Sequence, residues 1–196
     1  MTRIKLCGLS RESEILAANS LAPEYVGFVF WPHSKRYVIP RLALALREIL
    51  APEILAVGVF VDEKPEDLAA IADSGAIDII QLHGHEDESY ISRLRTLTSK
   101  PIIKAFRGQD IINAQDSTAD YVLLDSGMGT GKVFDWSAIT LSRSYFLAGG
   151  LSPSNVKDAI HTLKPFAVDV SSGIETAGKK DIAKMAAFVD AVRKEN

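Results

Sequence analysis

Cysteine is almost missing from this chain, in which Cys7 is the only thiol among 196 residues. A single cysteine excludes an internal disulfide, and the segment from Met1 to Lys5 leads directly into an apolar stretch without the pattern of a signal peptide. We therefore expect a protein of a reducing compartment, with the cytoplasm as the simplest location.

Long apolar runs, clusters of basic residues and low-complexity linkers are also missing. No apolar run approaches the ~18 residues that cross a bilayer, so the sequence predicts no membrane partner. The formal net charge is −3, with lysine and arginine scattered along the chain, which excludes nucleic acid as an expected partner and leaves only small anions as ligands. With 47% hydrophobic residues and no linker, residues 1–196 are expected to form one domain.

The sequence does contain a repeated alternation of short apolar segments with helical stretches. The segments expected as strands are 3–8, 25–30, 54–61, 77–82, 101–106, 121–125, 145–148 and 166–170. The helical stretches are expected at 11–20, 40–50, 65–74, 87–97, 111–116, a short one from 135, 152–163 and 180–193. Ser10 and Ser152 are the expected N-terminal caps of two of these helices.

Continuously apolar strands of this kind pair in parallel, because a crossover helix joins each strand to the next. Eight such units predict an α/β protein, a single closed (β/α)8 TIM barrel, and the chain lies at about the lower length limit of ~200 residues for that fold. The competing architecture is an open, doubly wound sheet. Its fingerprint G-x-G-x-x-G is absent after the first strand, where Cys7-Gly8-Leu9-Ser10 stands instead, so we favour the barrel.

The carboxyl ends of barrel strands form the site in such proteins, and the first strand ends on Cys7. Alternation along the strand places Lys5 and Cys7 on the same face. A lone cysteine is most often a small buried hydrophobe, and only its neighbours can favour a chemical role. Because an unpaired lysine inside a barrel is costly, we expect Lys5 to pair with Asp169 of the eighth strand and this pair to help set the ionisation of Cys7.

Glycine and serine follow the seventh and eighth strands. Gly149 and Gly150, and then Ser172 and Gly173, can present backbone N–H donors to a phosphate without obstruction by side chains. Either loop alone could equally be a tight turn. Because the two loops follow neighbouring strands, where barrel enzymes commonly hold a substrate phosphate, together they favour phosphate binding.

Two charged residues near strand ends are further candidates. Asp125 ends the sixth strand, where a partly buried carboxyl group could donate a proton; a helix cap or a loop ion pair is the alternative of equal weight. Arg36 lies in the loop after the second strand, and its guanidinium group could bind a carboxylate through two hydrogen bonds, although most loop arginines are only solvated.

Gln81 and His83 at the end of the fourth strand complete the polar set. His83 and His85 have no third ligand nearby, so we predict no metal site and expect His83 to form hydrogen bonds within the site. The glycine-rich segment 127–132 does not meet the spacing G-x-x-x-x-G-K-[ST] of a phosphate loop and is expected to be a flexible lid.

Motifs along the whole chain, in order, carry a resemblance to a known family. They are residues 5–10, 27–30, 34–37, 57–61, 81–84, 123–125, 129–132 with 134–136, 148–151 and 169–175. In combination they resemble phosphoribosylanthranilate isomerase. Leu6 and Ser10 depart from the usual isoleucine and threonine, at positions without a catalytic role.

This resemblance implies an enzyme of tryptophan biosynthesis that converts N-(5-phosphoribosyl)anthranilate into 1-(2-carboxyphenylamino)-1-deoxyribulose 5-phosphate without a cofactor. It implies that Cys7 is the general base, Asp125 the general acid and Arg36 the partner of the anthranilate carboxylate, with the phosphate held by the loops after strands seven and eight. A thiol with its ordinary pKa of ~8.5 is only a few per cent ionised at neutral pH, so we expect the surroundings of Cys7 to favour the thiolate.

Two other interpretations stay open. An aminoaldose isomerase of the histidine pathway resembles this chemistry, but it uses two aspartates, and the first half of the chain offers no second glycine-rich loop for a second phosphate. A barrel without catalytic activity could bind a phosphorylated metabolite or a partner protein. The sequence also leaves the oligomeric state open between a monomer and a homodimer.

Overall fold

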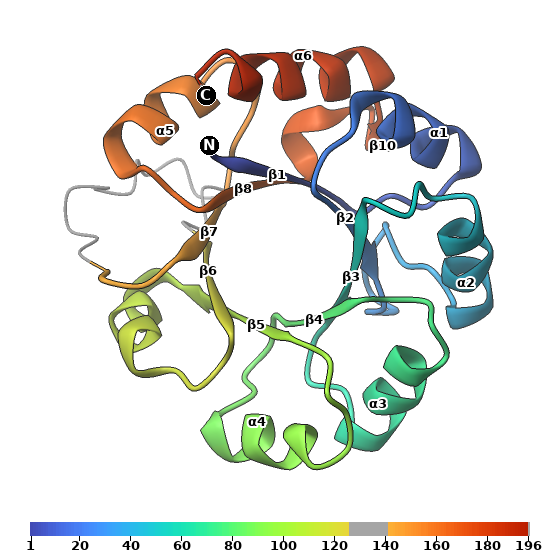
Figure 1. Ribbon diagram of the computed structural model, residues 1–196, viewed down its shortest axis with the longest axis vertical. Coiled ribbons are helices and arrows are strands. Elements are labelled where there is room, and N and C mark those ends of the chain that lie inside the picture. Colours follow the sequence, from blue (N-terminus) through green and yellow to red (C-terminus); the bar gives the residue numbers. More distant parts are fainter. Residues whose placement is uncertain (126–140, 196) are drawn as a thin grey trace.

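The strands of the chain close into a ring, as the computed structural model shows for residues 1–125 and 141–195 (Figure 1). Seen along the axis of the ring, the strands form the inner circle and the helices lie around it. Each strand is parallel to both of its neighbours, and the first strand pairs with the last to complete the ring. No edge of this sheet is therefore left open.

The elements of the ring alternate in chain order. The barrel strands are β1 (Arg3–Cys7), β2 (Tyr25–Val29), β3 (Leu55–Phe60), β4 (Ile79–Leu82), β5 (Ile102–Arg107), β6 (Tyr121–Asp125), β7 (Tyr145–Ala148) and β8 (Ala167–Val170). The helices are α1 (Glu12–Leu21), α2 (Pro40–Glu48), α3 (Pro65–Asp73), α4 (Glu88–Arg95), α5 (Val156–Leu163) and α6 (Ile182–Arg193). Two 3-10 segments, η1 (Gly108–Asp116) and η4 (Ser172–Ile174), and the antiparallel pair β9 (Glu175–Thr176) and β10 (Lys179–Lys180) complete the described elements.

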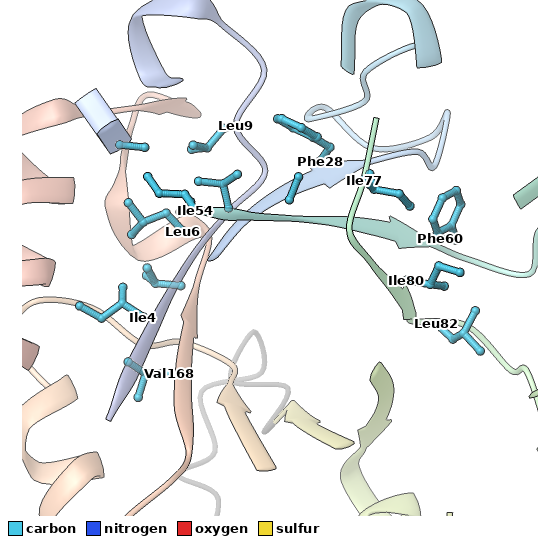
Figure 2. Packing of buried hydrophobic residues seen from close by; sticks show 14 of the residues in the cluster. Ile4, Leu6, Leu9, Phe28, Ile54, Phe60, Ile77, Ile80, Leu82 and Val168 are labelled. Atoms are coloured by element: carbon cyan, nitrogen blue, oxygen red, sulfur yellow. The ribbon is translucent and has the colours of Figure 1, made fainter. Parts of the chain in front are cut away.

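Alternation along the strands separates two apolar layers. The outer layer lies between the strands and the helices, and Figure 2 shows part of it, including Ile4, Leu6, Phe28, Phe60, Ile80 and Leu82. The inner layer fills the barrel and includes Tyr25, Val57, Ile79, Ile103, Leu123 and Phe146. Because both faces of the sheet are buried, almost every strand position requires an apolar residue, and this explains the continuous apolar segments of the sequence.

Lys5 interrupts the apolar interior of the barrel. Its side chain is fully buried, and Nζ lies 3.0 Å from each carboxylate oxygen of Asp169, its register partner on β8. Burial alone would lower the pKa of Lys5, but the negative charges of Asp169 and Cys7 outweigh burial and raise it. The expected pair is therefore confirmed, and it lies where the first and last strands meet.

The predicted barrel is confirmed, and the alternative open sheet is wrong. The observed limits of the strands agree with the predicted limits to within two residues. The predicted weak helix at 111–116 is part of the longer 3-10 segment η1. The predicted lid at 127–132 and the short helix from 135 lie outside the described residues. Within the described ranges, no helix has the length and apolar character needed to cross a membrane.

Both expected serine caps are wrong, because longer polar side chains take their place. At the start of α1, the carboxylate of Glu14 accepts the backbone N–H of Ser10 at 2.6 Å and satisfies the donor itself. At the start of α5, the amide of Asn155 accepts the N–H of Ser152 at 2.8 Å and donates to the carbonyl of Gly150 at 2.9 Å. This helix therefore begins at its Val156, and Asn155 fixes the loop that precedes it.

Replacing Lys5 with methionine tests the buried pair. The variant leaves the Asp169 carboxylate without its cation, and we expect the free energy of unfolding to fall by about 3–5 kcal/mol, as for other buried pairs that lose one partner. Urea denaturation measures the difference. The double variant Lys5→Met/Asp169→Leu removes both charges and should recover most of the loss. A Lys5→Met protein as stable as the parent would contradict this account.

Candidate active site

The carboxyl ends of the barrel strands surround a cavity of about 490 Å³. Most of the residues that the sequence singled out line it together: Cys7, Arg36, Gln81, His83, Asp125, Gly149, Gly150, Asp169 and Ser172. The two exceptions are Lys5, which lies beneath the cavity in its pair with Asp169, and Gly173, which packs against the neighbouring loop. Residues far apart in the sequence thus meet in one place because parallel strands all end on the same side of the barrel.

Cys7 ends β1 in the wall of the cavity and is 7% exposed. Burial raises the pKa of its thiol, the ammonium group of Lys5 lowers it, Asp169 raises it, and Lys180 lowers it again. The net effect is a pKa above the ordinary value. The expectation that the surroundings favour the thiolate is therefore wrong: the two lysines limit the rise but do not outweigh burial.

Asp125 belongs to a row of polar contacts that joins the ends of β6 and β4. Its Oδ2 lies 3.3 Å from His83 Nε2, and His83 Nδ1 lies 2.7 Å from Gln81 Nε2. Because an amide nitrogen only donates, Nδ1 accepts, and the proton of the neutral imidazole lies on Nε2, next to Asp125. The second polar atom of the amide, Gln81 Oε1, is buried and has no hydrogen-bond partner in the part of the chain that the structure describes.

Arg107 is a residue of the site that the sequence analysis missed. It is the last residue of β5, in register with Asp125, and its Nε lies 3.5 Å from Asp125 Oδ2. The side chain is 58% exposed, so water screens this attraction and keeps it weak. The available signal was a cation at a strand end, but the predicted strand stopped one residue earlier, at 106.

Arg36 reaches the cavity from the loop after β2, where Glu175 holds it. The Arg36 Nε lies 2.5 Å from Glu175 Oε1, and the same carboxylate pairs with Lys180 at 2.9 Å and with Lys35 at 3.1 Å. Burial raises the pKa of Glu175, but the hydrogen bonds from these cations prevail and lower it to about 2. Since Glu175 binds the Nε side of the guanidinium group, the two terminal nitrogens are the atoms suited to a second carboxylate.

Lys180 is the second residue that the sequence analysis missed. Its Nζ donates to the carbonyl of Ser171 at 2.8 Å, to Ser171 Oγ at 3.2 Å and to Glu175 Oε1 at 2.9 Å. Ser171 Oγ in turn donates to the carbonyl of Cys7 at 3.2 Å. No pattern marks this lysine, which follows the last barrel strand and was expected as the start of the last helix.

The glycines after β7 and β8 are required by the path of the backbone. Gly149 and Gly150 have φ values of 90° and 66°, a left-handed conformation that other residues rarely adopt. A Cβ on Gly173 would lie 1.9 Å from the carbonyl oxygen of Leu151, so the two loops touch backbone to backbone. Their N–H groups therefore approach one side of the cavity without intervening side chains, as an anion site requires.

The parallel ring and the polar cavity at its carboxyl ends define a (β/α)8 barrel of the kind whose strand ends carry an enzyme site. Among residues 1–125 and 141–195, no three His, Cys, Asp or Glu side chains group together as metal ligands. A family model described as N-(5'phosphoribosyl)anthranilate (PRA) isomerase matches residues 4–191. The chain belongs to this family.

Individual relatives support this assignment over the full length. The N-(5'-phosphoribosyl)anthranilate isomerase of Endomicrobium trichonymphae is 41% identical over 199 residues, which cover 98% of this chain and 99% of that protein. The crystal structure of phosphoribosyl anthranilate isomerase from Thermotoga maritima has a TM-score of 0.89 at 36% identity, with 99% and 100% of the two chains covered. A further isomerase structure, in complex with reduced 1-(o-carboxyphenylamino)-1-deoxyribulose 5-phosphate, has a TM-score of 0.87 at 35% identity and covers 99% and 100%.

The low pKa of Glu175 makes part of the stability depend on pH. The pKa is about 2 in the folded protein against an ordinary value of 4.5, so the unfolded chain binds the proton more readily. The stabilisation is therefore complete above pH 4.5 and is lost as the pH falls toward 2. In Glu175→Gln, we expect a shallower decline of the free energy of unfolding over this range than in the parent, measured by urea denaturation at several pH values.

The exposed Glu53→Gln variant is the matched control for this measurement and should follow the parent. If Glu175→Gln and the parent lose stability with equal slopes between pH 4.5 and 2, the ion cluster around Glu175 does not contribute as described.

Proposed function

We propose that the protein isomerises N-(5'-phosphoribosyl)anthranilate to 1-(2-carboxyphenylamino)-1-deoxyribulose 5-phosphate, the step of tryptophan biosynthesis for which its family is named. The observation that carries this proposal is a thiol, Cys7, and a carboxyl group, Asp125, in the wall of one cavity that also contains the glycine loops after β7 and β8. Membership of the family supports the activity, and the reduced product bound to a related isomerase supports the class of substrate.

The two anionic ends of such a substrate fit two parts of the cavity. The phosphate binds to backbone N–H groups of the loops that contain Gly149, Gly150, Ser172 and Gly173, where no side chain intervenes. The carboxylate of the anthranilate ring binds to the terminal nitrogens of Arg36, which Glu175 holds at Nε. The ribose carbon atoms then lie between these ends, within the wall formed by the remaining polar side chains.

Ring opening is the first chemical step, and it requires a proton on the furanose oxygen. Asp125 donates this proton in its acid form. The neighbouring His83, whose Nε2 proton faces Asp125 at 3.3 Å, can share and return it, while Gln81 fixes the orientation of the imidazole ring. The buried Gln81 Oε1 is in turn available to a hydroxyl donor of the ribose.

Proton removal from C2′ is the second step. The Schiff base formed on ring opening acidifies this proton, so that a base of modest strength suffices. The thiolate of Cys7 takes the proton to give an enolamine, which relaxes to the ketone. In this mechanism Cys7 is a base and forms no bond to carbon. The histidine-pathway alternative is not supported, because its aspartate is replaced by Cys7 at the end of β1 and the chain belongs to another family.

Single substitutions of the two proposed proton carriers test this function. We expect Cys7→Ala and Asp125→Asn each to lower kcat by about 10²–10⁴-fold, the usual contribution of a general base or acid, in a fluorescence assay of phosphoribosylanthranilate consumption. Asp62→Asn is the matched control: Asp62 pairs with His85 at 2.9 Å, but this His–Asp pair is exposed and lies outside the cavity. The control should retain the parent kcat. Near-normal turnover of Cys7→Ala or Asp125→Asn would reject the role assigned to that residue.

Gly173→Ala tests the phosphate loops separately from the proton carriers. The added methyl group would meet the Leu151 carbonyl and force the two loops apart, so we expect KM to rise about tenfold or more and inorganic phosphate to inhibit correspondingly less. Gly75→Ala controls for a general loss of stability, because Gly75 has a φ of 85° but its added Cβ would meet no atom within 4 Å. Unchanged phosphate inhibition in Gly173→Ala would remove the loops from the proposed phosphate site.

A further inference from the structure

Lys180 carries a buried positive charge that the mechanism described so far does not use. We propose that Lys180 is a positioning residue whose ammonium group, fixed behind the loop after β8, stabilises the thiolate of Cys7. The proposal rests on the function proposed above, since it concerns the base of that reaction. It assigns to Lys180 no contact with the substrate.

The position of Lys180 is set by three hydrogen bonds and by burial. Its side chain is 2% exposed, and its Nζ is held by both oxygens of Ser171 and by Glu175. Ser171 also donates to the backbone carbonyl of Cys7, so two hydrogen bonds connect the ammonium group to the residue that it is proposed to influence. A charge held this firmly in a buried site acts at short range with little screening by water.

The balance of charges around Cys7 shows why the thiolate has use for this cation. Lys5 lies beneath Cys7 on the same face of β1, but Asp169 on β8 neutralises it through both carboxylate oxygens. The opposing charges of this pair largely cancel at the thiol. Lys180 of β10 is the other cation whose charge acts on Cys7 from a buried position.

The carboxylate that pairs with Lys180 is shared. Glu175 binds Lys180, Arg36 and Lys35 together, so that a single negative charge faces three positive charges. A carboxylate from the substrate on Arg36 would balance one of these excess charges, and a thiolate at Cys7 would balance the other. The net charge of the cluster therefore favours a second anion beside Lys180.

The ionisation of Lys180 itself agrees with this accounting. Burial lowers its pKa, Glu175 and Cys7 raise it, and the net pKa stays below the ordinary value of 10.5. Glu175 therefore does not fully compensate the cost of burying the ammonium group. A negative charge on Cys7 would supply the missing compensation, and by reciprocity the ammonium group would make that negative charge easier to form.

Alkylation by iodoacetamide tests the proposal without any need for turnover. Cys7 is the only thiol in the chain, so the rate of alkylation reports the ionised fraction of this residue alone. At pH 8, we expect Lys180→Gln and Lys180→Met to be alkylated about tenfold more slowly than the parent, which corresponds to a rise of about one unit in the pKa of the thiol. Lys180→Arg retains the charge and should restore the rate to within about threefold of the parent.

The two neutral variants separate charge from structure. Glutamine keeps a donor for the Ser171 carbonyl, whereas methionine keeps only the apolar stem, and circular dichroism establishes which of them is folded before alkylation. Lys184→Met is the matched control, because Lys184 binds the backbone carbonyl of Glu175 at 2.8 Å from an exposed position; it should react at the parent rate. If a folded neutral variant reacts as fast as the parent, or if arginine fails to restore a slowed rate, the proposal is overturned.

The pH dependence of kcat/KM keeps this outcome distinct from the proposed function. If Cys7 is the base, the acidic limb of the profile shifts upward in Lys180→Gln by the same amount as the alkylation profile. A slowed alkylation without any shift of this limb would support the effect of Lys180 on the thiol and reject Cys7 as the base of the reaction.

Discussion

The ion pair between Lys5 and Asp169 is the contact on which the arrangement of the site depends. It lies where β1 meets β8, fully out of water, and each charge is satisfied by the other. A slip of one residue between these strands would leave both charges buried and unpaired, at a cost of several kcal/mol. The pair thus fixes the register that places Cys7, two residues after Lys5, beside the loop that follows Asp169. The position of the proposed base is a consequence of a buried salt bridge.

Charge is distributed unevenly along the rim of the cavity. One side, near β1 and β8, contains Arg36 and Lys180 around the single carboxylate of Glu175, whereas the side near β4 and β6 contains the neutral amide of Gln81 and the pair of His83 with Asp125. A substrate with a phosphate and a carboxylate is attracted to the first side, and proton exchange is left to the second. This separation keeps the proposed acid away from the cations that would hold it permanently ionised.

Sequence reasoning found what depends on local patterns and missed what depends on burial and long-range contacts. The barrel follows from eight apolar segments, and the Lys5–Asp169 pair follows from alternation within a strand. The pKa of Cys7 was predicted in the wrong direction, because the sequence shows the nearby lysine but not the depth at which the thiol is buried. Lys180 was missed because its partners, Ser171 and Glu175, belong to a turn that forms only after β8 has joined the ring.

The contact of Gly173 with the carbonyl of Leu151 has an evolutionary consequence. Two polypeptide segments that touch without an intervening side chain cannot vary in length one at a time, since an insertion in either would push the other out of place. Loops at the mouth of a barrel are usually the parts most free to diversify. Here the pair after β7 and β8 must change as a unit or not at all, so we expect new specificities to arise in the connections on the opposite side of the mouth.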